Sequence, residues 1–230
     1  MSQNKGVFVM GTGTDVGKTY VAALLINRLR QEGINANYYK AAVSGNSRIG
    51  GKLIPGDALF VKNFANLDAD LSEMVSYVYE EPLSPHLAAR KEENFADIGT
   101  IKAAFRKISR KSDFVVVEGS GGVLCPLVYD GEVAIWLEDI VRILRLPVVV
   151  VADAGLGTIN ATGLTVWYLK RNDFDVKGII LNNFDEINFM HVDNKCVIED
   201  ITRIPVIATV KKSSEILEGF DSRILLERED

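Results

Sequence analysis

The sequence GTGTDVGKT, residues 11–19, follows directly on the apolar run Val7–Met10 and leads into an amphipathic stretch. It nearly matches a loop that holds nucleotide phosphates, but the usual spacing has a glycine where Thr12 stands. The order of strand, loop and helix is the context in which such a loop works, because the helix N-terminus carries partial positive charge. Lys18 can then reach the outer phosphates, and the Thr19 hydroxyl can ligate Mg²⁺. The alternative is an ordinary helix start after a tight turn.

Apolar runs rich in β-branched residues alternate with amphipathic stretches along the chain. The expected strands are Val7–Met10, Ala36–Lys40, Phe114–Glu118, Pro147–Ala152, Val176–Asn182 and Val206–Val210. The expected helices are Thr19–Gln31, Asp57–Phe64, Ile98–Ser109, Val133–Leu144, Thr158–Lys170 and Asn194–Thr202. Continuous apolar strands that alternate with helices are typical of a parallel sheet covered on both faces. The sequence therefore predicts an α/β fold, a three-layer P-loop NTPase-like domain with a mostly parallel central sheet flanked by helices.

Composition narrows the class of protein further. No repeat or Pro- or Gly-rich linker interrupts the pattern, so residues 1–230 are expected to form a single domain. The net charge of −5 lacks the basic excess of a sequence-independent nucleic-acid binder, so we expect no nucleic-acid partner. No apolar stretch approaches the roughly 20 residues that cross a bilayer, and the N-terminal MSQNKG is polar rather than signal-like. We therefore expect a cytoplasmic protein with no membrane partner.

The cysteines and histidines carry little chemistry in this pattern. Cys125 and Cys196 are far apart and have no partners at metal spacing, so we expect no disulfide or zinc site and a packing role for both. Neither His86 nor His191 lies in a segment that resembles a nucleophile elbow. A hydrolase of the serine type is therefore not favoured.

Two strand ends carry charged side chains. Phe114–Glu118 ends in a carboxylate and is followed by Gly119-Ser120-Gly121-Gly122, where backbone can approach a ligand closely. Ligands gather at the carboxyl ends of parallel strands, and an acid there can hold Mg²⁺ directly or through water. The alternative for this segment is a plain strand-end turn.

Lys40 ends the second expected strand and opens a polar segment without periodicity, residues 41–56, which is a candidate for substrate contact. We expect its strand to lie beside the strand of the phosphate loop, so that Lys40 places a second ammonium near a phosphoryl group. The alternative is a solvated edge charge. Asp57 follows at an expected helix start, either as an N-cap or as a further oxygen near Mg²⁺.

Six ordered segments carry a resemblance to a known family. They are GTGTDVGKT (residues 11–19), YKAAVSG (39–45), GDAL (56–59), EPLSPHLAA (81–89), VVVEGSGG (115–122) and GLGTINAT (155–162). Together they resemble the dethiobiotin synthetases, ATP-dependent ligases of biotin biosynthesis whose phosphate loop has the same longer glycine spacing. Where that family often has a Gly-Glu-Ile-Pro-like sequence near the adenine, this chain has ATVKKS, residues 208–213.

The resemblance implies a reaction. Members join 7,8-diaminononanoate with CO₂ to form a carbamate on one amine. The carbamate oxygen attacks the γ-phosphate of Mg-ATP, and the second amine closes a ureido ring, giving dethiobiotin, ADP and phosphate. ATP is thus a co-substrate, and Mg²⁺ is the implied cofactor.

The resemblance also implies roles for residues at matching positions. The implied catalytic residues are Lys40 and Lys18, and the implied metal ligands are Thr19, Asp57 and Glu118. The implied nucleotide-binding residues are Gly13, Thr14, Asp15, Val16, Gly17, Lys18, Thr19, Tyr20, Asp57, Glu118, Gly119, Ser120, Gly121 and Asn182. The implied substrate-binding residues are Thr14, Lys40, Ser44, Ser84, Gly121, Gly157, Thr158 and Asn160.

The family works as a homodimer, and the resemblance implies that the segment with Gly157, Thr158 and Asn160 acts from the partner chain. The main alternative is a partition or positioning ATPase, a switch protein with the same kind of loop. Such proteins carry a lysine just after the first glycine of the loop, where this chain has Thr12. An amidotransferase-type synthetase would need a glutaminase domain, for which 230 residues leave no room.

Overall fold

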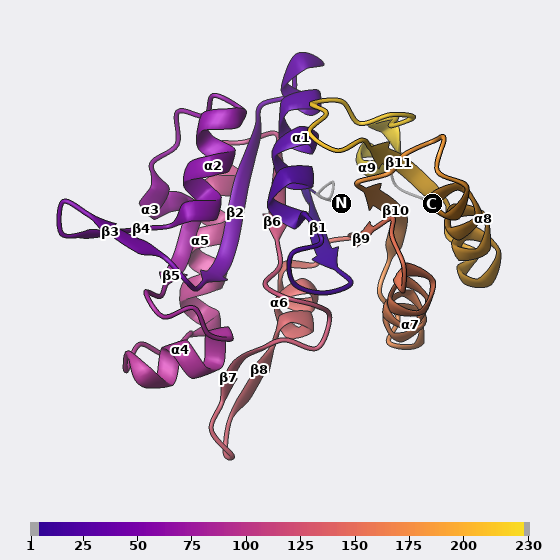
Figure 1. Ribbon diagram of the computed structural model, residues 1–230. Helices are drawn as coiled ribbons and strands as arrows, with labels where there is room; N and C mark the ends of the chain where they lie inside the picture. The colour runs from indigo at the N-terminus through magenta and orange to yellow at the C-terminus, as the bar shows by residue number, and fades with distance from the viewer. Residues whose placement is uncertain (1–4, 228–230) are drawn as a thin grey trace.

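Within residues 5–227, the part of the chain that the computed structural model describes, seven strands form one sheet (Figure 1). The order is β11-β10-β9-β1-β6-β2-β5, and every neighbouring pair is parallel. The strands are β1 (Gly6–Gly11), β2 (Ala36–Val43), β5 (Val75–Val78), β6 (Phe114–Glu118), β9 (Val148–Asp153), β10 (Val176–Asn182) and β11 (Val206–Val210). The predicted parallel sheet is therefore confirmed.

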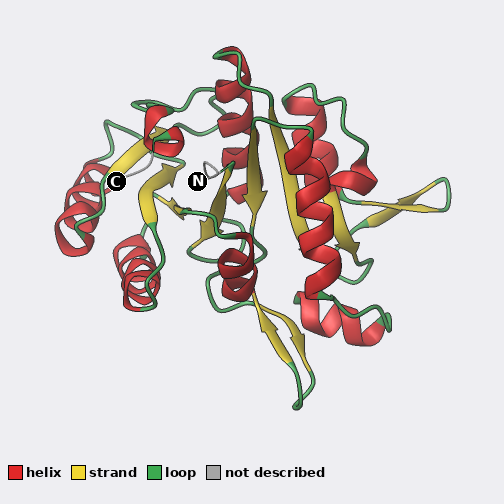
Figure 2. Ribbon diagram, turned by 180° about the vertical axis from the view of Figure 1, so that it is seen from behind, coloured by secondary structure: helices red, strands yellow, loops and turns green. Residues whose placement is uncertain are grey.

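Helices cover both faces of this sheet, as the opposite views in Figures 1 and 2 show for α1 and α2 on one face and α5 and α6 on the other. The helices are α1 (Lys18–Gln31), α2 (Gly56–Phe64), α3 (Leu71–Met74), α4 (Pro85–Lys91), α5 (Ile98–Arg110), α6 (Leu137–Leu144), α7 (Thr158–Arg171), α8 (Phe189–Thr202) and α9 (Arg223–Leu226). One apolar core lies under α1, α2, α3 and α9, and a second lies under α4 to α8. The three-layer α/β architecture is thus as predicted.

The central strand β1 shows why the apolar runs do not alternate with polar residues. Phe8 and Met10 pack into one core, while Val7 and Val9 pack into the other. Successive side chains of a strand point to opposite faces, so a strand covered on both faces needs apolar residues at every position. The run that precedes the phosphate loop is therefore anchored from both sides.

The strand order corrects one expectation about the site. The strand of Lys40, β2, does not lie beside β1, because β6 lies between them. In this register Glu118 of β6 pairs with Val9 of β1 on one side and with Lys40 of β2 on the other. The carboxylate is therefore the group that stands next to both the phosphate loop and the lysine.

Several short elements were not predicted. The polar segment 41–56 contains a hairpin of β3 (Ser47–Ile49) and β4 (Lys52–Ile54), and a second hairpin joins β7 (Pro126–Tyr129) to β8 (Ala134–Trp136). Both hairpins project from the body of the molecule in Figure 1. The edge strand β5 and the helices α3 and α4 were also missed.

Two expected helix starts were wrong. The helix expected from Val133 begins at Leu137, because the preceding residues pair in β8 and the Asp139 carboxylate accepts a hydrogen bond from the Trp136 N–H at 2.8 Å. The helix expected from Asn194 begins at Phe189, where the Asn188 side chain accepts from the Met190 N–H at 3.0 Å. In both cases a local cap decides the start.

Three further expectations bear on location and cysteine chemistry. No helix in residues 5–227 is long and apolar enough to cross a bilayer. Of the segment MSQNKG, residues 1–4 lie outside the described part of the chain. Both cysteines are free; Cys125 is buried as expected, whereas Cys196 is exposed on α8, so its expected packing role is wrong.

Gly178 yields a stability prediction. A Cβ at this position of β10 would lie 2.4 Å from Cγ2 of Ile207 on β11. Gly178→Ala is therefore expected to lower the free energy of unfolding by about 1–3 kcal/mol, measured by urea denaturation. Combining it with Ile207→Ala removes the obstructing atoms, so the double variant should lose less stability than the sum of the two single variants. Simple additivity would contradict the steric explanation.

Candidate functional site

A cavity of about 560 Å³ opens where the carboxyl ends of β1, β2 and β6 meet the loops that follow them. This is the position at which open parallel sheets bind their ligands. Of the predicted site residues, those that line it are Thr14, Asp15, Gly17, Lys18, Thr19, Tyr20, Lys40, Ser44, Asp57, Glu118, Ser120 and Gly121. The structure therefore brings together most of the residues that the sequence pattern identified.

The phosphate loop (residues 11–19) is held in a specific shape. Gly17 has φ of 92°, and a Cβ there would lie 2.0 Å from Nδ2 of Asn182. The same Asn182 amide donates to the Val16 carbonyl at 3.1 Å, which ties the end of β10 to the loop. Only glycine combines this left-handed backbone with so close an approach. The loop therefore delivers residues 18 and 19 to the start of α1.

Lys18 curls back over the loop, and its ammonium donates to the Gly13 carbonyl at 2.7 Å. Burial lowers the pKa of Lys18, and the nearby charge of Lys40 lowers it further, although Glu118 and Asp57 act in the opposite direction. A phosphate oxygen near the Lys18 ammonium would accept a stronger hydrogen bond than the Gly13 carbonyl does, because hydrogen bonds between two charged groups are stronger.

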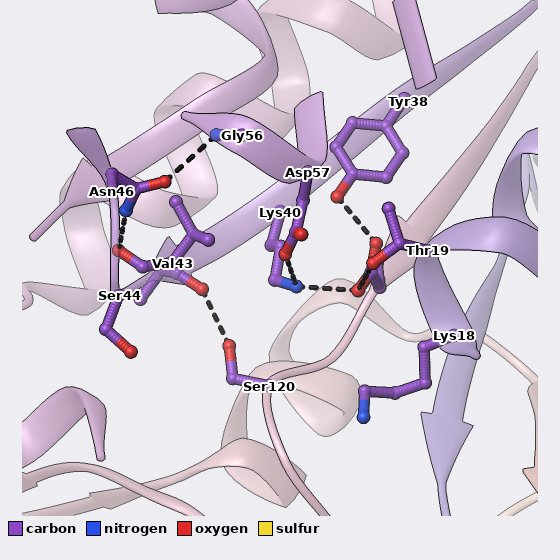
Figure 3. A network of polar contacts seen from close by, with 12 residues as sticks. Lys18, Thr19, Tyr38, Lys40, Val43, Ser44, Asn46, Gly56, Asp57 and Ser120 are labelled. Carbon is purple, nitrogen blue, oxygen red and sulfur yellow. Dashed lines mark hydrogen bonds and ion pairs between the residues drawn. The ribbon is translucent and has the colours of Figure 1, made fainter. Parts of the chain in front are cut away.

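Lys40 lies at the centre of the site, 4% exposed, between two carboxylates (Figure 3). Its Nζ donates to Glu118 Oε1 and to Asp57 Oδ2, each at 2.6 Å. Burial by itself lowers the pKa of Lys40, but the two carboxylates outweigh it, so the pKa lies above its ordinary value. The alternative of a solvated edge charge is therefore wrong, and Lys40 is held as a buried cation.

Asp57 reaches Lys40 because Asn46 fixes the start of α2. The Asn46 Oδ1 accepts from the Gly56 N–H at 2.9 Å, and its amide donates to the carbonyls of Val43 and Tyr79. The N-cap position is Pro55, and Asp57 lies in the first turn with its carboxylate on the lysine. The N-cap alternative for Asp57 is therefore wrong.

Glu118 is bound through both of its carboxylate oxygens. Oε1 accepts from Lys40 and from the Thr19 hydroxyl, the latter at 2.9 Å. Oε2 accepts from the hydroxyl of Tyr38 at 2.7 Å. Burial and the adjacent Glu118 raise the pKa of Tyr38 well above its ordinary value, so this phenol keeps its proton. Tyr38 is fully buried and was not among the predicted site residues.

The oxygen atoms at this point suit a magnesium ion. Asp57 Oδ2 and Glu118 Oε1 both accept from the Lys40 ammonium, so a cation fits between them, and the Thr19 hydroxyl donates to the same Glu118 oxygen. Mg²⁺ prefers oxygen ligands and usually keeps waters and substrate phosphates as well. No group of three or more His, Cys, Asp or Glu side chains suited to a metal occurs in residues 5–227. Two carboxylates and one hydroxyl therefore fit a metal that arrives with a phosphate rather than a closed metal cage.

Two of the three predicted serines, Ser44 and Ser120, line the cavity. The Ser44 hydroxyl donates to the Leu83 carbonyl and the Ser120 hydroxyl to the Ala42 carbonyl, each at 2.6 Å. Ser84 does not line the cavity, but it follows directly on the Leu83 contact, and its hydroxyl lies 3.1 Å from His86 Nδ1. Ser84 therefore stands beside the cavity rather than within it.

Other predicted residues also lie outside the cavity lining. Gly13, Val16, Gly119 and Asn182 belong to the loop or to the strand ends behind it. Gly157, Thr158 and Asn160 lie at the start of α7, after β9, and do not line the cavity. The described chain thus brings the phosphate and lysine residues together and leaves the segment 157–160 apart.

Two residues of the lining were not predicted, Val43 and Phe60. Phe60 lies one turn after Asp57 on α2, so both residues lie on one face of the helix. This spacing could have identified Phe60 as a site residue from the sequence. Its ring lies 6.0 Å from that of Tyr20, whose hydroxyl donates to the Ser214 carbonyl at 2.9 Å. This contact places Ser214 beside Tyr20, which lines the cavity.

Comparison with known proteins places these observations in a family. A family model described as an AAA domain matches residues 5–218. An ATP-dependent dethiobiotin synthetase BioD from Clostridium botulinum, strain Loch Maree, is 48% identical over 212 residues, which cover 92% of this chain and 93% of the relative. The protein of the same description from strain Langeland is 47% identical over the same shares.

Solved structures show the same fold at low sequence identity. A ParA family ATPase from Chlorobium tepidum TLS has 16% identity and a TM-score of 0.54, covering 92% of this chain and 86% of that one. The structure of the MinC:MinD cell division complex of Aquifex aeolicus has 13% identity and a TM-score of 0.53, covering 92% and 83%. Chloroplast FtsY from Physcomitrella patens has 17% identity and a TM-score of 0.56, covering 98% and 65%. At these identities the likeness shows the fold alone.

The buried ion pair yields a second stability prediction. Glu118→Gln removes a charged partner from Lys40 while keeping the side-chain shape, and it is expected to lower the free energy of unfolding by about 3 kcal/mol. The matched control is Glu80→Gln, which breaks the exposed ion pair with Arg48 and should change stability far less. If chemical denaturation gave the same loss of stability for Glu118→Gln and Glu80→Gln, burial of the Lys40–Glu118 pair would not make it more important for stability than the exposed Arg48–Glu80 pair.

Proposed function

Since the chain belongs to the ATP-dependent dethiobiotin synthetase family, we propose that it joins CO₂ to 7,8-diaminononanoate and closes the ureido ring of dethiobiotin, with conversion of ATP to ADP and phosphate. The observation that carries the proposal is the convergence of Lys18, Lys40, Thr19, Asp57 and Glu118 in one cavity. Within this proposal residues 1–230 act as a single ligase domain, and a biosynthetic enzyme of this kind is expected in the cytoplasm.

The proposed reaction has three steps. One amine of the substrate adds to CO₂ and loses a proton, which gives a carbamate anion. A carbamate oxygen then attacks the γ-phosphorus of ATP, the bond to the β-phosphate oxygen breaks, and ADP leaves. The second amine attacks the carbonyl carbon of the mixed anhydride, phosphate departs with the bonding electrons, and loss of a proton completes the ring.

Lys18 and Lys40 are placed to stabilise the negative charge that develops in these steps. A carbamate, a triphosphate and their mixed anhydride are all anionic, so preorganised ammonium groups lower the energy of the transition states. We propose that Lys18 holds the β- and γ-phosphates from the start of α1 and that Lys40 faces the carbamate and the transferring phosphoryl group. The raised pKa of Lys40 keeps its ammonium protonated for this role.

Thr19, Asp57 and Glu118 are the proposed ligands of Mg²⁺. When bound, Mg²⁺ would neutralise phosphate charge and polarise the γ-phosphoryl group. Thr19 Oγ1 and Glu118 Oε1 already lie 2.9 Å apart, which keeps both oxygens at the same side of the cavity. Asp57 closes this oxygen set from α2.

The nucleotide is proposed to lie along the loop from Gly13 to Tyr20, with its base towards Asn182. Gly119, Ser120 and Gly121 provide close backbone at the end of β6, where Gly121 has φ of 64°. The loop 211–217 is tied to Tyr20 through Ser214, so it lies beside the proposed path of the nucleotide. Sequence around Ala208–Ser213 differs from the usual family pattern, so base selectivity is a property to measure.

The diamine is proposed to lie on the other side of the lysines, against Thr14, Ser44, Ser84 and Gly121. We further propose a homodimer in which Gly157, Thr158 and Asn160 reach the substrate of a neighbouring copy. Support comes from their position at the N-terminus of the fourteen-residue helix α7, whose backbone N–H groups suit the substrate carboxylate. These three residues do not line the cavity of their own chain, which agrees with such an arrangement.

The partition-ATPase alternative has only the fold in its favour. The ParA and MinC:MinD structures share only 13–16% sequence identity with this chain, whereas the two dethiobiotin synthetases share 47–48% over nearly the whole chain. Thr12 also occupies the position at which that class carries a lysine. The two functions differ in what triggers ATP consumption.

The first functional prediction separates them. With Mg²⁺, ATP, labelled bicarbonate and 7,8-diaminononanoate, the protein is expected to form one labelled cyclic urea for each ADP released. Product is measured by mass spectrometry and ADP by a coupled assay, and omission of the diamine is the control. ATP consumption that requires DNA, lipid or a partner protein instead of the diamine would support the switch alternative.

The second functional prediction concerns Lys40. Lys40→Ala and Lys40→Gln are each expected to lower kcat by about 10²–10³-fold, because an ammonium that stabilises developing charge is lost. Lys62→Ala is the matched control, since Lys62 donates to the Ala69 carbonyl and does not line the cavity. Circular dichroism checks folding. Near-normal turnover in a folded Lys40 variant removes Lys40 from the mechanism.

A further inference from the structure

Two consecutive tyrosines on β2, Tyr38 and Tyr39, are both fully buried, yet they face opposite sides of the sheet. Tyr39 packs into the core under α4 to α8, and its hydroxyl contacts the Ser76 hydroxyl and the Ile101 carbonyl. Tyr38 packs into the core under α1 and α2, on the same strand face as Lys40. The two phenols are alike in burial and differ in what their hydroxyls contact.

The hydroxyl of Tyr38 contacts the carboxylate that the site depends on. It donates to Glu118 Oε2 at 2.7 Å, and no other hydrogen bond to this oxygen is present in residues 5–227. The other oxygen, Oε1, accepts from Lys40 at 2.6 Å and from Thr19 at 2.9 Å. The two oxygens of Glu118 are thus divided between the Tyr38 phenol on one side and Lys40 and Thr19 of the cavity on the other.

This division has a physical consequence. The terminal torsion of a glutamate side chain has a broad energy profile, so the carboxylate plane is set by its hydrogen bonds and not by its rotamer. Lys40 and Thr19 line the cavity, where the proposed phosphates and metal would contact them, whereas Tyr38 lies in the core and is 0% exposed. The phenol is therefore the partner that holds the carboxylate while the contacts on its other side change.

We propose that Tyr38 is a positioning residue for the cation that accompanies the nucleotide: it holds Glu118 Oε2 and so presents Oε1 to the cavity. The inference rests on the proposed magnesium-dependent function. Tyr38 does not reach the cavity lining, so it acts only through Glu118. Groups that orient a ligating carboxylate usually affect metal affinity by about 10- to 100-fold when they are removed.

The experiment compares Tyr38→Phe with Tyr39→Phe. Each substitution removes one buried hydroxyl from β2 and keeps the ring, so the change in packing is closely matched, whereas only Tyr38→Phe removes a hydrogen bond to Glu118. Mn²⁺ serves as the probe, and its binding to the protein with a non-hydrolysable ATP analogue is titrated by electron paramagnetic resonance. Tyr38→Phe should weaken Mn²⁺ binding by about 10- to 100-fold, and Tyr39→Phe should leave it close to wild type.

Turnover gives an independent readout. In Tyr38→Phe the Mg²⁺ concentration for half-maximal activity should rise, while kcat at saturating Mg²⁺ stays near wild type. Thermal unfolding of both variants shows whether each remains folded at the assay temperature.

Two results would overturn the inference. Unchanged Mn²⁺ affinity in Tyr38→Phe would show that Glu118 is held without the phenol. An equal loss in both variants would assign the effect to general packing of β2. Failure of the wild-type protein to bind Mn²⁺ with the nucleotide analogue is a different result, because it removes the proposed magnesium site itself.

Discussion

A buried ammonium between two carboxylates is the constraint around which the functional end of this sheet is arranged. Taking Lys40 and Glu118 out of water costs several kcal/mol for each charge unless they meet at close range and their remaining hydrogen-bonding capacity is used. The parallel register of β2 and β6 sets them opposite one another, and Asp57, Thr19 and Tyr38 occupy the remaining positions. Strand order, the start of α2 and the start of α1 are therefore coupled through one ion pair.

This coupling explains which parts of the site could be predicted from the sequence. Glu118 was found because it ends an apolar run, and the carboxyl ends of parallel strands meet at one edge of a sheet. Lys40 was found at the expected end of its strand, although β2 in fact continues to Val43. The phosphate loop was found because its glycine and lysine spacing is local. The contact between Asp57 and Lys40 was harder to predict from the sequence, because it depends on the Asn46 amide that fixes the start of α2.

Long-range order lies beyond such local patterns. The residues of β1, β2 and β6 do not indicate that β6 lies between the other two strands, since all three strands are mainly apolar. Tyr38 shares its strand face with Lys40, a period-two relation that is visible in the sequence. Its partner Glu118 is 80 residues away, however, so the role of the phenol follows only from the register of the sheet. Short hairpins and caps, such as those before α6 and α8, also depend on contacts that composition does not reveal.

The charge balance of the cavity connects this arrangement with the proposed chemistry. Lys18 and Lys40 carry two positive charges, and Asp15, Asp57 and Glu118 carry three negative charges, so the charged residues of the lining sum to −1. A nucleotide triphosphate without a cation would therefore meet no net attraction from them, and it would stand close to these carboxylates. A divalent cation that arrived with the phosphates would reverse this balance, because it would pair with the carboxylates and leave both ammonium groups to face anionic oxygens. Under the proposed function, the ion pair between Lys40 and Glu118 therefore predicts that binding of the nucleotide depends on its metal.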